Sequence, residues 1–253
     1  MLTTAQEGAY DRAVQGVDAI IHCASPFHYT ADDPAELVNP AVQGTTTVLT
    51  SALKHGTVLK RFIVTSSVAA MITPSAELHT VSEADWNEGA LAEIQEKGAG
   101  ASPLGKYCAS KTLGERTAWD FWSQHKNEVR WDVVSLNPPY VFGPVLHEVE
   151  KPEKLNESMR WWYDAVVGGT IDNAMLAVLG YVRHSSACMR IVLTNGFHSF
   201  SVAWVDVRDI AEAYVQALTR PQVSGERIMI SAATFKLQDF GAYPDFDAVH
   251  GQS

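Results

Sequence analysis

The sequence has little of what several protein classes require. It contains three cysteines, Cys23, Cys108 and Cys188, which are widely spaced and form no Cys-x-x-Cys pair, so neither a metal site nor a disulfide framework is predicted. No apolar run approaches the ~18 residues that a membrane span requires, so we expect no transmembrane helix. The first residues combine neither a basic nor an apolar segment, so we expect no secretory signal and a cytoplasmic location.

Positive charge is also scarce. The chain has 19 Lys and Arg residues against 29 Asp and Glu residues, which gives a formal net charge of -10. Nucleic-acid binding depends on clustered basic side chains, so this balance argues against a nucleic-acid partner.

A glycine-rich phosphate-binding turn is missing as well. The sequence has a single Gly-x-Gly, at Gly98 and Gly100, and it lies in a polar segment that is followed by Pro103. Such a turn should instead join a strand to a helix, where backbone amides hold a pyrophosphate. Gly98 and Gly100 therefore do not supply that site.

What is present is a regular alternation of two kinds of segment. Short apolar runs that end at turn-prone residues indicate buried strands, and longer amphipathic runs indicate helices. In chain order these segments are residues 17–22, 37–55, 61–65, 104–125 and 132–136. The alternation predicts βαβ units with right-handed crossovers, and so an α/β fold with a parallel sheet.

The pattern weakens after Pro144. Residues 145–157 are charged and loop-like, and an aromatic cluster follows at residues 161–163. Strand, helix and strand are again indicated at 202–205, 210–218 and 227–230, with Asp206 expected to cap the helix. We therefore predict a division of the chain near residue 144.

Tyr107 and Lys111 form the first candidate constellation. A spacing of four residues places both side chains on one face of a helix. Tyrosine and lysine meet this spacing often by chance, and a surface pair is the alternative interpretation, so the surrounding residues must decide.

Ser66 and Ser67 supply that context, because they follow a predicted parallel strand and ligands gather at the carboxyl edge of such sheets. A phenol has a pKa near ~10, and an adjacent ammonium lowers it. Tyr107 could then donate a proton to a carbonyl oxygen that a serine hydroxyl steadies while hydride reaches the carbon. The loop at 137–144 is proline-rich and rigid, and its backbone could also bond a nicotinamide carboxamide.

Five segments together resemble a known family. They are Ile-His-Cys-Ala-Ser-Pro-Phe at 21–27, Val-Thr-Ser-Ser-Val-Ala-Ala at 64–70, Tyr-Cys-Ala-Ser-Lys at 107–111, Asn-Pro-Pro-Tyr-Val-Phe-Gly-Pro at 137–144 and Val-Asp-Val-Arg-Asp at 205–209. Their types and order resemble the extended short-chain dehydrogenase/reductases, also called the NAD-dependent epimerase/dehydratase family. Within it they are most similar to the dihydroflavonol reductase-like group, which includes fungal aldehyde, ketone and methylglyoxal reductases.

The resemblance implies an NADP-dependent oxidoreductase that reduces an aldehyde or ketone. It implies a Rossmann-type doubly wound sheet, with a partial dinucleotide-binding domain at 1–144 and a mixed, partly substrate-binding segment at 145–253 whose residues 202–230 return to the sheet. The implied catalytic residues are Ser67, Tyr107 and Lys111. The implied cofactor-binding residues are Ala24, Ser66, Tyr107, Lys111, Pro138 and Val141.

The chain also departs from the family pattern. It corresponds to the family from just before the fourth strand, so we expect the first βαβ units and their glycine-rich turn to be absent. Residues 170–200 look longer than in the family, and the segment after Asp239 is short, so we expect an incomplete substrate domain.

Two alternatives therefore stay open. One is a non-catalytic homologue or partner of an intact reductase, which could associate through an exposed sheet edge. The other is a sugar epimerase, dehydratase or hydroxysteroid dehydrogenase of the same superfamily.

Overall fold

The computed structural model describes residues 6–73, 80–146, 148–167, 192–194, 197–199 and 201–236. The chain forms two compact units. The first comprises Met1–Thr73, Val81–Pro139 and Arg208–Ile230, and the second comprises Pro74–Thr80, Tyr140–Val207 and Ser231–Ser253. Cys188, most of the segment at 170–200 and the C-terminus after residue 236 lie outside the described residues.

The first unit is built on a parallel sheet of four strands in the order β1-β2-β3-β8. The strands are β1 (Ala19–His22), β2 (Arg61–Thr65), β3 (Asp132–Asn137) and β8 (Arg227–Met229). All four runs were expected from the sequence, although β1 begins two residues later than predicted. The predicted α/β class with a parallel sheet is confirmed.

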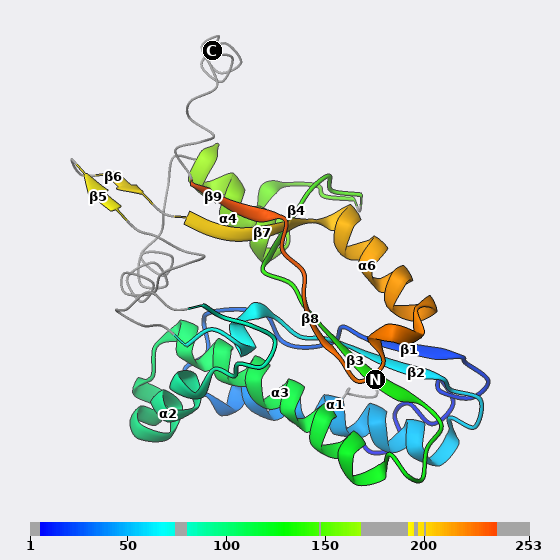
Figure 1. The fold of residues 1–253 in the computed structure, drawn as a ribbon. Helices are drawn as coiled ribbons and strands as arrows, with labels where there is room; N and C mark the ends of the chain where they lie inside the picture. The colour runs from blue at the N-terminus through cyan, green and yellow to red at the C-terminus, as the bar shows by residue number, and fades with distance from the viewer. Residues whose placement is uncertain are drawn as a thin grey trace. The chain divides into compact units, whose positions relative to one another are not determined.

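Helices cover both faces of this sheet (Figure 1). Helices α1 (Ala35–His55) and α3 (Pro103–His125) lie on one face, and α6 (Val207–Thr219) lies over the other. Strand β2 shows why: Phe62 and Val64 join the core cluster with α1 and α3, whereas Thr65 bonds Tyr214 of α6. Alternate residues of a strand point to opposite faces, so a buried strand must be apolar on both sides.

The helix that carries the candidate site has a well-defined start. The Ser102 hydroxyl accepts a hydrogen bond from the Gly105 amide at 3.0 Å, and Pro103 occupies the first helical turn. A serine cap followed by proline is a favourable helix N-terminus, because it satisfies an orphan amide and fixes the backbone in advance.

The sequence did not indicate one helix. Helix α2 (Glu88–Lys97) precedes α3 and is capped by Asn87, whose side chain accepts from the Ala90 amide. The Gly98 to Gly100 segment forms the short 3-10 turn η2 (Gly98–Gly100) between α2 and α3, and Gly98 has a φ of 52°. It links two helices, which agrees with the expectation that it does not replace a phosphate-binding turn.

The second unit contains the sheet β4-β7-β9 and helix α4 (Glu157–Val166). Strands β4 (Tyr140–Phe142) and β7 (Ser201–Asp206) are parallel, and β9 (Ala233–Lys236) runs antiparallel to β7. Strands β5 (Val192–Thr194) and β6 (Phe197–Ser199) pair separately. The charged segment predicted to be loop-like at 145–157 contains, among its described residues, the 3-10 turn η3 (Pro152–Lys154) and, at Glu157, the first residue of α4. None of the described helices combines the length and apolar composition needed to cross a membrane.

Candidate active site

The carboxyl ends of three strands in the first unit meet at one edge of the sheet. Because β1, β2 and β3 are parallel and paired in register, the residues that follow them lie near one another. The 3-10 turn η1 (Val68–Ala70) follows β2 and contacts α3. Ser67, Ala24 and Pro138 are therefore brought to this edge, and α3 brings Tyr107 and Lys111.

Tyr107 lies in an aromatic cluster on α3. The residue is only 8% exposed, and its ring centre lies 5.1 Å from that of Phe27 and 5.3 Å from that of Tyr29. The ammonium nitrogen of Lys111 lies 5.9 Å from the centre of the Tyr107 ring. The structure thus brings the predicted pair together on one helix face and packs the phenol ring against two other aromatic rings, which also contact each other.

The loop that supplies Phe27 and Tyr29 is fastened to α3 by Lys106. The Lys106 Nζ donates to the carbonyl oxygens of Ala31 and Asp32, at 3.1 and 2.6 Å, and its side chain is buried. A buried ammonium needs such partners, because an unpaired charge in the interior is costly. No sequence pattern indicated this role, since Lys106 is simply the residue before Tyr107.

Lys111 lines a small pocket at the strand ends. The pocket has a volume of about 280 Å³, including space open to solvent. It is lined by residues of β1, α1, β2, α3 and the segments that follow the strands: His22, Ala24, Ser25, Ala41, Thr45, Val64, Thr65, Ser66, Ser110, Lys111, Gly114 and Glu115. Burial lowers the pKa of Lys111 to about 8, with a smaller opposing effect of Cys23. Its ammonium is thus largely charged at neutral pH and can donate to a ligand.

His22 is the neutral group of this pocket. Its Nε2 lies 3.2 Å from the Thr45 hydroxyl, which itself donates to the Ala41 carbonyl at 2.8 Å. Burial first, and then the charge of Lys111, lower the pKa of His22 to about 4. The Thr45 oxygen already donates its proton to Ala41, so it accepts from His22, which fixes the Nε2-protonated tautomer.

Ser67 is placed at the turn after β2. Its hydroxyl donates to the Pro138 carbonyl at 3.3 Å and accepts from the Ala69 amide at 3.1 Å. Ala69 packs against the cluster that contains Tyr107, so the turn that begins at Ser67 lies beside the tyrosine. The 3.3 Å bond is long, and a hydroxyl in this position can rotate to another acceptor.

Ser66 has a different environment. Its amide donates to the Leu136 carbonyl at 2.9 Å, and its hydroxyl donates to Glu115 Oε2 at 2.6 Å. Ser66 lines the pocket, yet both of its donors are used within the fold. A ligand could therefore contact Ser66 only by donating a hydrogen bond to one of its oxygens or by packing against it.

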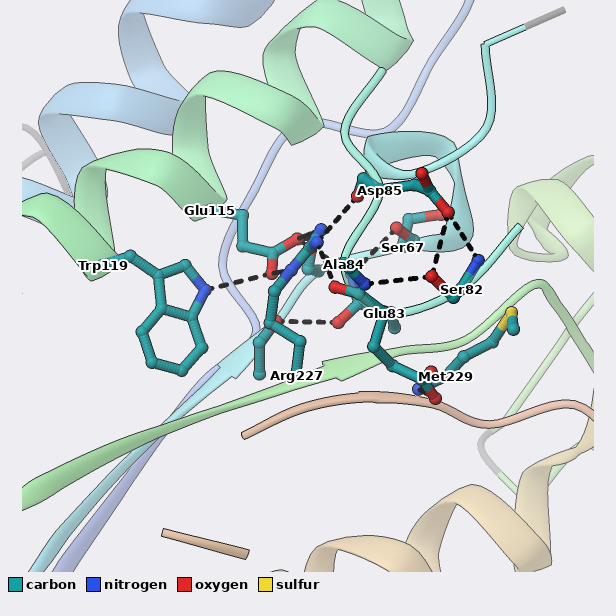
Figure 2. Close-up of polar contacts among 12 residues, drawn as sticks. Ser67, Ser82, Glu83, Ala84, Asp85, Glu115, Trp119, Arg227 and Met229 are labelled. Carbon is teal, nitrogen blue, oxygen red and sulfur yellow. Dashed lines mark hydrogen bonds and ion pairs between the residues drawn. The ribbon is translucent and has the colours of Figure 1, made fainter. Parts of the chain in front are cut away.

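Glu115 lies at the centre of a buried polar network (Figure 2). Its carboxylate accepts hydrogen bonds from Arg227, Ser66, Asn137 and Trp119. Burial raises the pKa of Glu115, but the bonds and charge of Arg227, with those of Ser66 and Asn137, outweigh it and hold the pKa below its ordinary value. The carboxylate is therefore ionised. Glu115 was not among the residues predicted for the site, although its spacing of four residues after Lys111 places it on the same helix face.

The two remaining predicted residues are divided between the units. Pro138 belongs to the first unit, where its carbonyl accepts from Ser67 and from the Val68 amide. Val141 belongs to the second unit, in β4, where it pairs with Val205 of β7. Among the described residues, no group of three or more His, Cys, Asp or Glu side chains is arranged to hold a metal ion.

Comparison with known proteins decides the family. Residues 2–231 match the NAD dependent epimerase/dehydratase family. The chain belongs to this family. Its curated relatives include a ketoreductase of Aspergillus niger, 34% identical over 235 residues, and an NADPH-dependent methylglyoxal reductase of Saccharomyces cerevisiae, 28% identical over 240 residues. Each alignment covers 91% of this chain, and they cover 61% and 62% of those proteins.

Solved structures give the same assignment. The yeast methylglyoxal/isovaleraldehyde reductase in complex with NADPH matches with a TM-score of 0.73 and 25% identity, over 93% of this chain and 64% of that protein. The predicted resemblance to reductases of the epimerase/dehydratase family is thereby confirmed. The chain spans about three fifths of the length of the curated relatives it matches.

Proposed function

We propose that this epimerase/dehydratase-family chain carries the proton-transfer residues of an NADPH-dependent reductase that converts a small aldehyde or ketone into an alcohol. The observation that carries the proposal is the Tyr107 and Lys111 pair. The Lys111 ammonium lies 5.9 Å from the Tyr107 ring centre, and the lysine lines a pocket at the carboxyl ends of the strands. The reductase names of relatives at 28% identity or more favour this activity over the epimerase and dehydrogenase alternatives.

The proposed roles follow from the chemistry of the side chains. Tyr107 donates a proton to the carbonyl oxygen of the substrate, and the positive charge of Lys111 stabilises the phenolate that remains. The Ser67 hydroxyl rotates from the Pro138 carbonyl to the same substrate oxygen and stabilises the charge that develops there. Phe27 and Tyr29 exclude water from the phenol ring.

The residues present fit one end of a dinucleotide. When bound, NADPH would supply the hydride. Lys111, which lines the pocket as an ammonium, would bond the hydroxyls of the nicotinamide ribose, and the surface of Ser66 and Ala24 would bound the same pocket. We propose Pro138 and Val141 for the nicotinamide side on the family resemblance. The sequence holds no glycine-rich turn for the pyrophosphate.

Dinucleotide titration tests the proposal. Nicotinamide fluorescence of NADPH should change saturably on addition of the chain, and a panel of small aldehydes and ketones should then accelerate NADPH oxidation. Lys111→Met should weaken NADPH binding, because it removes the ammonium while keeping most of the side-chain volume. Lys60→Met, which removes an exposed lysine paired with Asp18, is the matched control and should bind as the unmodified chain does. Absence of any NADPH binding would rule the proposal out.

Strand β1 favours a second candidate function, association through the sheet. It is the outer strand of the four-stranded sheet and, among the residues that the structure describes, it pairs on one side only, with β2. Its Ile21 side chain is 41% exposed, although strands of parallel sheets are ordinarily covered. A self-associating chain would elute at a concentration-dependent size, and Ile21→Lys would reduce that size. A concentration-independent monomer would argue against association.

A further inference from the structure

Glu115 occupies the same face of α3 as the proposed proton-transfer pair. It follows Lys111 by one helical turn and Tyr107 by two. Its side chain is buried, with the residue only 1% exposed. A carboxylate in the interior is strongly unfavourable unless hydrogen-bond donors surround it, so the donors around Glu115 are the first thing to identify.

Both carboxylate oxygens are fully occupied. Oε1 accepts from Arg227 Nε at 2.7 Å and from the Trp119 indole at 3.1 Å. Oε2 accepts from the Ser66 hydroxyl at 2.6 Å, from Asn137 Nδ2 at 2.8 Å and from the second Arg227 nitrogen at 3.3 Å. Figure 2 shows the Arg227 guanidinium and the Trp119 ring converging on this carboxylate. The donors come from the ends of β2 and β3, from β8 and from α3 itself.

Two of these donors, Ser66 and Asn137, are connected directly to Ser67. Ser66 is its neighbour in the chain, and Asn137 Nδ2 also donates to the Ser67 carbonyl at 3.1 Å. Asn137 in turn precedes Pro138, whose carbonyl accepts the Ser67 hydroxyl. The backbone of Ser67 and the acceptor of its side chain are thus both tied to one carboxylate on α3.

Arg227 anchors the network from its other side. Its Nη1 donates to the carbonyls of Glu83 and Asp85, at 2.6 and 2.7 Å, and its guanidinium lies 3.7 Å from the centre of the Trp86 ring. Arg116 lies 4.8 Å from the same ring centre. The Arg227 and Glu115 pair therefore fixes α3 to β8 and to the segment before α2, which leaves little freedom for the carboxylate.

We propose that Glu115 is a positioning residue, which holds the Ser67 turn and the start of the Pro138 loop in register with the Tyr107 and Lys111 face of α3. The inference rests on the proposed reductase function. Proton donation and oxygen stabilisation must act on the same substrate atom, so an error of about 1 Å between Ser67 and Tyr107 costs on the order of 100-fold in rate. Glu115 joins the two elements that carry them by hydrogen bonds, in addition to the packing of Ala69 against the Tyr107 cluster.

A second ion pair, between the buried Arg61 and the partly buried Asp132, provides a control. Arg61 donates to both oxygens of Asp132, at 2.7 and 2.6 Å, and also to the carbonyls of Ala217 and Arg220. Arg61 and Asp132 begin β2 and β3, so this pair lies at the opposite edge of the sheet from Ser67. Asp132→Asn disturbs a bidentate arginine and carboxylate pair as Glu115→Gln does, without touching the carboxyl ends of the strands.

The test is a double-mutant cycle in the full chain. NADPH-dependent carbonyl reduction is measured for the unmodified chain, Ser67→Ala, Glu115→Gln and the double variant, and the same cycle is run with Asp132→Asn. We expect Glu115→Gln to lower kcat by about 10- to 100-fold while KM changes less than about threefold. Its effect should largely vanish in the Ser67→Ala background, whereas the Asp132→Asn effect should be the same in both backgrounds.

A second variant and a second measurement make the test independent of folding and turnover. Asn137→Ala cuts the link to Ser67 and leaves the Arg227 pair intact, so it should couple to Ser67→Ala in the same way. In hydrogen exchange, Glu115→Gln and Asn137→Ala should each accelerate exchange of the Val68 amide, which donates to the Pro138 carbonyl, by about 10-fold relative to Asp132→Asn.

These measurements distinguish failure of the Glu115 positioning role from failure of the proposed reductase activity. If the unmodified chain reduces carbonyls, the cycle decides, and additive effects of Glu115→Gln and Ser67→Ala overturn the positioning role. If the unmodified chain does not turn over, the proposed function fails and exchange decides. Unchanged protection of Val68 in Glu115→Gln and Asn137→Ala then overturns the inference, and faster exchange supports it.

Discussion

The ammonium of Lys111 lies 5.9 Å from the ring centre of Tyr107, and burial lowers the pKa of this lysine to about 8. Burying the Lys111 ammonium therefore lowers the stability of the fold. The same ammonium lies close to a phenol, whose ionised form it would stabilise. Perturbed titration of this kind clusters at functional sites, because catalysis requires it and stability does not.

The cost of burying Lys111 can be measured. Its pKa is lowered relative to the unfolded chain, so protonation disfavours the folded state below pH 8, and the penalty disappears as pH rises through the unfolded value of about 10.5. Lys111→Met should therefore raise the free energy of unfolding by about 1 to 2 kcal/mol at pH 7. The gain should shrink as pH approaches 10.5. Urea unfolding at both pH values checks this, and a pH-independent gain would contradict it.

His22 should limit stability on the acid side. Burial and Lys111 lower its pKa to about 4 in the folded chain, from an ordinary value of 6.5. Its contribution is complete above pH 6.5 and is lost as pH falls towards 4, because the unfolded chain binds the proton first. Between pH 7 and 4 the free energy of unfolding should fall less steeply in His22→Asn than in the unmodified chain. The two decreases should differ by about 1 to 3 kcal/mol over this range. Parallel curves for the two proteins would show that His22 titrates normally.

Lys106 should stabilise the loop that carries Phe27 and Tyr29. Lys106→Met removes two hydrogen bonds to backbone carbonyls and leaves those carbonyls without their donor. We expect a loss of about 1 to 3 kcal/mol in the free energy of unfolding and faster hydrogen exchange in residues 27–32. Lys60→Met removes an exposed ion pair and should change stability by less than about 1 kcal/mol. Equal effects of the two substitutions would exclude the proposed anchoring.

The two cysteines in the described part of the chain should differ in reactivity. Cys23 is exposed at the end of β1, whereas Cys108 is buried in α3 and burial raises its pKa to about 12. The thiolate is the reactive form, so an alkylating reagent at neutral pH should modify Cys23 in the folded chain and Cys108 only after unfolding. Peptide mapping by mass spectrometry separates the two sites. Modification of Cys108 under native conditions would mean that α3 opens readily.

The sequence was sufficient for the elements whose pattern is local. Strands β2 and β3 and helices α1 and α3 follow from apolar spacing, and the pair at Tyr107 and Lys111 follows from the helical repeat. Helix α2 was missed because it is short and polar, with Asn87 as its main signal. The Glu115 network was missed for another reason: Arg227 lies 112 residues from Glu115 along the chain, so only the folded sheet brings the two together.

The most direct test of the central claim follows the hydrogen that is transferred. The chain is incubated with a carbonyl substrate and NADPH labelled with deuterium on the nicotinamide ring, and the alcohol is analysed by mass spectrometry. We predict deuterium on the carbinol carbon, and a fall of about 100-fold or more in its rate of appearance in Tyr107→Phe, which keeps the ring but cannot donate a proton. Equal rates in the two proteins would contradict the assignment of Tyr107 as the proton donor.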